Sequence, residues 1–267
     1  MAGHAADRLG FLPNGKRPAF FRARVPPRIH FPPKGMNMKQ KKISKMNELA
    51  WVIGIVVCSL GVCLCTKADF GLSMIAAPPY ILHYALRGVF PWFTQGRAEY
   101  AWQALLLLGM CLAVGRFRWR YLLSFGTAVI AGRVIDLWFL VLGGNAPYET
   151  MPARIAAFAA GVILTAIAIA FVFRTDWPVQ IYELLVWEIA DRFGFEVNRV
   201  KLCNDIAMFV LSAALSFFLT GGFHGFGVGT VVITAVNAPI IALSGKLLDK
   251  LFTFDPRFPQ VTDKLKS

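Results

Sequence analysis

Two oppositely charged residues lie inside a long apolar stretch, and their types and spacing suit them to chemistry. Arg133 and Asp136 are three positions apart, so on a helix they would share one face and could pair. A charge at the middle of a membrane helix costs about 2.5–3.5 kcal/mol, so such residues usually face protein or water. Two interpretations stay open. The pair could lock helix packing, or Arg133 could hold an anionic group while Asp136 exchanges a proton.

Two more polar residues lie within apolar runs and join the charged pair in a candidate substrate or ion pathway. Asn237 comes shortly before Pro239, which frees a backbone carbonyl. Asn237 could bond to that carbonyl, bind an ion or bond to another helix. Asp205 lies near the start of its run, where it could cap the helix, pair with Lys201 or contribute to the pathway.

A glycine-rich loop precedes the last apolar run. Gly225, Gly227 and Gly229 could allow close packing or present backbone N–H groups to an anion. The loop lacks the GxxxxGK[ST] pattern of a nucleotide P-loop, and the chain lacks HExxH, GxSxG and CxxC motifs. His83 and His224 have no Cys or Glu at ligand spacing. We therefore expect no enzyme activity, no cofactor and no metal site.

The composition indicates what must position these residues. Hydrophobic residues make up 57% of the chain, charged residues make up 16%, and the mean hydropathy is +0.56. A soluble domain is roughly 45–50% apolar and about 25% charged. One protein core could not bury so much apolar surface, so we expect a lipid bilayer as the partner. The net charge of +13 lies mainly at 1–46 and in short connections, which argues against nucleic-acid binding.

Six apolar runs predict an all-α integral membrane protein with about six transmembrane helices. The runs cover 49–66, 100–115, 121–143, 154–173, 202–219 and 228–244. The connections that would face outward hold few basic residues, namely Lys67, Arg87 and Arg97, and the opposite connections hold many more. This bias predicts that both termini are cytoplasmic.

An internal similarity predicts that the chain is two inverted three-helix repeats, 47–150 and 151–254. The sequence GTAVI at 126–130 returns as GTVVI at 229–233, and shifts of about 103–107 residues align the six runs three on three. Because three is odd, the second unit must enter the membrane from the opposite side, as in many secondary transporters. We expect a basic, Pro-rich, disordered extension at 1–46, whose start codon could be misassigned, and a cytoplasmic tail at 255–267.

Each predicted repeat has one further apolar segment after its first helix. These segments are 70–86, which contains Pro78 and Pro79, and 177–190, which begins near Pro178. They could lie along the membrane surface, re-enter the membrane around a substrate cavity, or span it fully.

Short motifs resemble the YitT/YczE-type family of bacterial membrane proteins. They are LGV at 60–62 with KADFGLS at 67–73, the glycine-rich 221–230, the helix at 126–137 and KLLDKLF at 246–252. The likeness covers about 46–254 and implies a multi-pass inner-membrane protein without assigned catalytic residues. The chain departs from the pattern in its basic extension and in Ala238-Pro239, where Gly-Pro is expected.

These patterns favour a permease or exporter of a small solute. The alternative is a regulatory or assembly protein of the membrane that carries no solute. The sequence also leaves a homo-oligomer open.

Overall fold

Every regular element that the structure describes is an α-helix. The computed structural model describes residues 47–222 and 224–252, so the predicted extension at 1–46 and tail at 255–267 lie outside the described residues. The helices are α1 (Asn47–Ala68), α2 (Ala77–Leu86), α3 (Gln95–Val114), α4 (Trp119–Val141), α5 (Met151–Val172), α6 (Ile181–Phe193), α7 (Val197–Thr220) and α8 (Val228–Leu251). The predicted all-α class is confirmed.

Five of the described helices are long and apolar enough to cross a membrane, namely α1, α4, α5, α7 and α8. The sixth predicted span corresponds to α3, which has 20 residues. At a rise of 1.5 Å per residue, 20 residues reach about 30 Å, the thickness of the hydrocarbon core. Arg97 and Glu99 make the first turns of α3 more polar than those of the other five. The chain is therefore a helical protein with several helices suited to a membrane.

The long helices carry large apolar side chains on their outer faces. Leu112 is 84% exposed, Leu140 78% and Phe218 81%. Monomeric soluble proteins rarely expose large contiguous apolar patches. This surface fits lipid.

The two short helices each follow an extended connection and are partly enclosed by long helices. Helix α2 packs against α3 and α7, and α6 packs against α3, α4 and α7. Ala77 and Ile81 of α2 and Ile181 of α6 have no exposed surface. With 10 and 13 residues, these helices reach only about 15 and 20 Å, which is too short for the predicted alternative of full spans.

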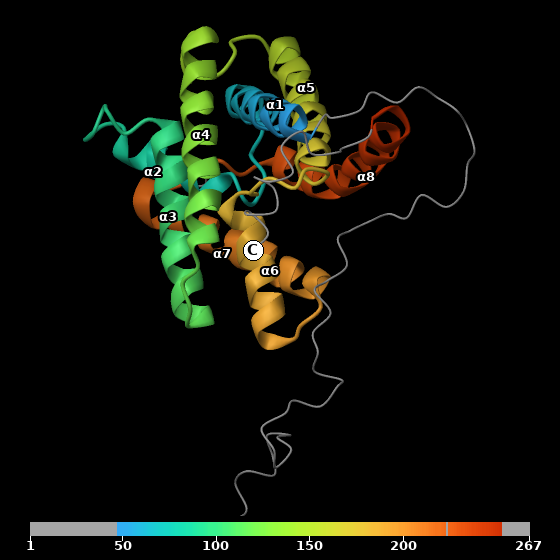
Figure 1. Cartoon of the computed structure of the whole chain (residues 1–267). Coiled ribbons are helices and arrows are strands. Elements are labelled where there is room, and N and C mark those ends of the chain that lie inside the picture. Colours follow the sequence, from blue (N-terminus) through green and yellow to red (C-terminus); the bar gives the residue numbers. More distant parts are fainter. Residues whose placement is uncertain (1–46, 223, 253–267) are drawn as a thin grey trace, which may run out of the picture.

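The helix order long, short, long, long occurs twice along the chain (Figure 1). Helix α1 packs against α5. The other contacts correspond between the two halves, because α1 packs against α4 as α5 packs against α8, and α2 packs against α7 as α6 packs against α3. Helices α3 and α4 lie side by side in Figure 1 and pack more extensively than α7 and α8.

Glycines bring α1 and α5 into backbone contact. A Cβ on Gly61 would lie 2.8 Å from the Gly161 carbonyl oxygen, and a Cβ on Gly161 would lie 2.8 Å from that of Gly61. Small residues at such crossings let membrane helices approach closely. This crossing joins the two halves of the described chain.

Candidate functional site: a cavity between the two halves

A cavity of about 160 Å³ lies where the two halves meet. Its walls come from α1, α4, α5, α6 and α8, together with Glu99 of α3. The ends of both extended connections also line it, through Ser73 and Ala76 before α2 and through Gln180 before α6. Both short helices therefore begin at the same cavity.

The connection before α6 is held by the first turns of α1 and by α4. Asn47 Oδ1 accepts a hydrogen bond from the Asp176 N–H at 3.0 Å. The Pro178 carbonyl accepts bonds from Trp51 Nε1 and Thr127 Oγ1, each at 3.1 Å. Since an extended segment leaves backbone groups unpaired, these side chains make its burial possible.

The connection before α2 is held by α5 and by the loop before α8. Leu72 N–H donates to the Gly225 carbonyl at 2.9 Å, and Gly229 N–H donates to the Phe70 carbonyl at 2.8 Å. Arg154 Nε donates to the Ala68 carbonyl at 2.8 Å. Both connections are therefore fixed by contacts with the opposite half.

Glu99 lies at the centre of a buried hydrogen-bond network beside the cavity. Its side chain is buried, and its Oε1 accepts bonds from Tyr182 Oη at 3.0 Å and from Gln103 Nε2 at 3.2 Å. The same Gln103 nitrogen donates to Gln180 Oε1 at 2.8 Å, and Gln103 Oε1 accepts from Ile181 N–H at 3.0 Å. The network ties the start of α6 to α3 and leaves Glu99 Oε2 without a partner among the described residues.

The chain matches a described family over most of its length. The family described as "Family of unknown function (DUF6198)" covers residues 45–246. The chain belongs to this family. It is also 21% identical over 212 residues to the uncharacterized protein YyaS of Bacillus subtilis (strain 168), covering 78% of this chain and 96% of YyaS. No solved structure matches the chain.

Membership of DUF6198 supports the coarser part of the resemblance, a helical membrane-type protein. The finer likeness to YitT/YczE-type proteins is not shown by these comparisons and stays a prediction. Neither the family nor YyaS has an assigned activity in these matches, so the function of this DUF6198 protein rests on its own residues.

The charged residues of α4 do not form the predicted pair in this DUF6198 chain. Arg133 is exposed, and its guanidinium lies 6.0 Å from the centre of the Tyr100 ring. Asp136 instead accepts bonds at the start of α3, from Thr94 Oγ1 at 2.7 Å and from Gly96 N–H at 2.8 Å. Asp136 is thus a cap for a neighbouring helix.

Replacing the two residues should therefore have unequal effects on stability. We expect Asp136→Ala to lower the free energy of unfolding by about 2 kcal/mol, because it leaves Gly96 N–H without its charged acceptor. Arg133→Ala should change it by less than about 0.5 kcal/mol, as for other exposed side chains. Thermal unfolding of both variants in detergent measures this difference. Equal losses would contradict the assignment of Asp136 as a cap.

The other predicted pathway residues lie apart from each other. Asn237 lines the cavity, and its Oδ1 is buried without a partner among the described residues. Asp205 lies on α7 outside the cavity lining, and its Oδ2 is 3.7 Å from Lys201 Nζ. The Lys201 alternative for Asp205 is therefore the one that the structure forms.

The three loop glycines are closely packed. A Cβ on Gly225 would lie 2.9 Å from the Tyr80 ring, and one on Gly229 would lie 2.7 Å from the Phe70 carbonyl oxygen. A Cβ on Gly227 would also clash with Phe70 O. Gly229 N–H is already bonded to this carbonyl, so it is not free for an anion.

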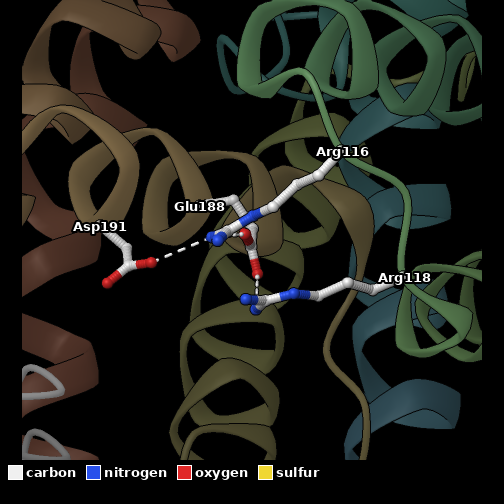
Figure 2. Close-up of polar contacts among 4 residues, drawn as sticks. All are labelled: Arg116, Arg118, Glu188 and Asp191. Carbon is white, nitrogen blue, oxygen red and sulfur yellow. Dashed lines mark hydrogen bonds and ion pairs between the residues drawn. The ribbon is translucent and has the colours of Figure 1, made fainter.

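Ion pairs link the helix ends away from the cavity. Figure 2 shows Arg116 between Glu188 and Asp191, at 2.9 and 3.0 Å, and Arg118 at 3.4 Å from Glu188. They fix the last turns of α6 to the connection between α3 and α4. The start of α6 is therefore held by the Glu99 network and its end by this cluster.

His83 joins the end of α2 to two connections. Its Nδ1 lies 2.8 Å from the Phe93 carbonyl oxygen, and its Nε2 lies 3.0 Å from Asn145 Nδ2. Burial lowers the pKa of His83. Since a carbonyl only accepts and an amide nitrogen only donates, the neutral ring with a proton on Nδ1 satisfies both contacts. This assigns His83 a structural role.

Two acids of the cavity were missed from the sequence. Glu99 precedes the predicted run at 100–115, and Glu183 lies within the predicted segment 177–190. One signal was available, since Glu99 and Gln103 are four positions apart and therefore share a helix face.

Proposed function

We propose that this DUF6198 protein is a permease or exporter of a small solute in a bacterial inner membrane, with the cavity as its solute site. The observation that carries the proposal is that both extended connections end at one cavity, each at the first turn of a short helix. In many secondary transporters, substrate sites lie where interrupted helices from two repeats meet.

The proposal includes two inverted repeats, each of four helices with one short helix that re-enters the membrane. The repeated helix order and the exchangeable helix contacts support it, and so do the matching sequences at 126–130 and 229–233. The Lys and Arg bias then puts both termini on the cytoplasmic side. A relationship to YitT/YczE-type proteins would agree with this arrangement.

Cys58 offers a direct test of access to the cavity. It lines the cavity and is a free thiol, as are the other four cysteines. In a variant that retains only Cys58, we expect a small charged methanethiosulfonate to label it from either membrane face. The reason is that a transporter opens its site alternately to the two sides. Right-side-out and inside-out vesicles provide the measurement.

Leu112→Cys in a cysteine-free chain is the matched control, because this position is 84% exposed on the apolar outer face of α3. A charged reagent enters lipid only at high cost, so we expect labelling of this thiol to be at least about tenfold slower. Labelling of Cys58 from only one face, or no faster than the control, would contradict transport.

The regulatory alternative needs a free cytoplasmic surface on 177–192. In the structure, Glu188 and Asp191 of this segment are paired with Arg116 of the same chain. This makes the alternative the weaker of the two.

A further inference from the structure

The charge of the cavity lining is one-sided. Of the described residues that line it, Glu99 and Glu183 are acidic, and none is Lys, Arg or His. A buried carboxylate without a counter-charge is costly, so it is normally paired or neutralised. The lining therefore holds two acidic residues and no basic residue to balance them.

The basic residues around the cavity are engaged elsewhere. Arg174 forms a bidentate pair with Asp249 at 2.6 and 2.8 Å. Lys67 Nζ donates to the Gly144 carbonyl at 2.9 Å. Lys201 on α7 is close enough to interact electrostatically with Glu183, but its ammonium group pairs with Asp205.

The two described donors to Glu99 both reach the same carboxyl oxygen. Tyr182 Oη and Gln103 Nε2 both donate to Oε1, and Oε2 receives no bond from the described residues. Glu99 is 8% exposed and lines the cavity, so its Oε2 is an acceptor available at the cavity wall.

The starts of α2 and α6 offer few free backbone N–H groups that could hold an anion. Ala76 and Ala77 N–H groups both donate to the Ser73 carbonyl at 3.0 Å, and the next two residues are prolines, which have no N–H. In α6, Ile181 N–H is bonded to Gln103 Oε1. At the start of α2 the donors that would hold an anion are thus absent or used, and at the start of α6 the first of them is used.

The size and the remaining surface of the cavity limit the ligand further. An engineered protein cavity of about 150 Å³ holds one benzene molecule, so about 160 Å³ admits a ligand of similar size. Much of the wall is aliphatic, for example Ile55, Ile135 and Ile233. Asn237 adds an unpartnered acceptor oxygen.

We propose that the cavity binds a small monovalent organic cation, with its ammonium group at Glu99 and Glu183 and its apolar body against the aliphatic wall. This deepens the proposed function, because it names the class of solute for the same cavity. A compact amine with one apolar group has the required charge and size.

The test uses benzylammonium as the probe, with benzyl alcohol and benzoate as neutral and anionic compounds of similar shape. Binding to the full chain in nanodiscs is measured by calorimetry. We expect benzylammonium to bind, benzyl alcohol to bind about tenfold more weakly, and benzoate not to bind, because a hydrogen-bonded charge contributes about 1.5–3 kcal/mol.

Binding measurements on three variants test whether benzylammonium binds at Glu99 and Glu183. Glu99→Gln and Glu183→Gln should each weaken benzylammonium binding by about tenfold or more. Glu196→Gln should bind as the parent does, because Glu196 lies at the surface beside Arg199. Glu99→Gln should fold, because the glutamine side chain can still accept from Tyr182. If Glu99→Gln does not fold, the binding measured for Glu183→Gln tests the proposal. No benzylammonium binding, equal binding of benzoate, or unchanged binding in a folded Glu99→Gln or Glu183→Gln chain would overturn the proposal.

The outcome is separable from that of the Cys58 experiment. Labelling of Cys58 from both faces without benzylammonium binding would retain transport and reject the cation. Benzylammonium binding with labelling from one face would retain the cation site and reject transport.

Discussion

Replacing Gly96 with alanine is expected to destabilise the protein by about 3 kcal/mol, at the upper end of the cost of adding one methyl group to a packed interior. The added Cβ would clash with the Gly132 carbonyl oxygen and would lie 2.7 Å from the Asp136 carboxylate. A backbone carbonyl cannot rotate away as a flexible side chain can. Helices α3 and α4 must therefore separate. Glu99, which lies about one turn after Gly96 on α3, is displaced with them.

Gly109→Ala is the matched control on the same helix, because a Cβ there would meet no atom within 4 Å. Alanine favours a helix over glycine by about 1 kcal/mol, so this variant should be as stable as the parent or slightly more stable. Thermal unfolding in detergent compares the two variants. Equal melting temperatures would contradict the close approach of α3 and α4 at Gly96.

The sequence predicted the long helices well because their signal is local. Apolar runs at 49–66 and 154–173 lie almost entirely within α1 and α5. The run at 100–115 missed the first turn of α3, where Thr94 is the N-cap and its side chain accepts from Arg97 N–H. Glu99 and Arg97 in this turn reduce its hydropathy, so apolarity alone places the start too late.

The sequence could not predict the partners of charged side chains. The spacing of Arg133 and Asp136 shows that the two residues could pair on one helix, but not that Asp136 accepts instead from donors at the start of α3. Helix α4 is apolar on most of its surface, so its sequence does not show which side faces lipid. Arg133 is exposed and Asp136 is turned toward α3, although they are only three residues apart.

The cavity depends on contacts between segments far apart in the chain. Glu99 meets Tyr182 and Gln103 meets Gln180, and no local pattern joins these positions. Of the predicted pathway residues, Asn237 lines the cavity, whereas Asp136, Arg133 and Asp205 do not. Glu99 and Glu183 meet at the cavity because α6 packs against α3, and this contact has no local sequence signal.

Cysteines at positions 89 and 195 test most directly whether the two halves enter the membrane from opposite sides. Val89 is 69% exposed in the connection after α2, and Phe195 is 61% exposed in the connection after α6. In a cysteine-free chain, we expect an impermeant maleimide to label Val89→Cys only from outside the cell and Phe195→Cys only from the cytoplasmic face of inverted vesicles. Labelling of both positions from the same face would contradict the inverted arrangement, and with it the site proposed between the two halves.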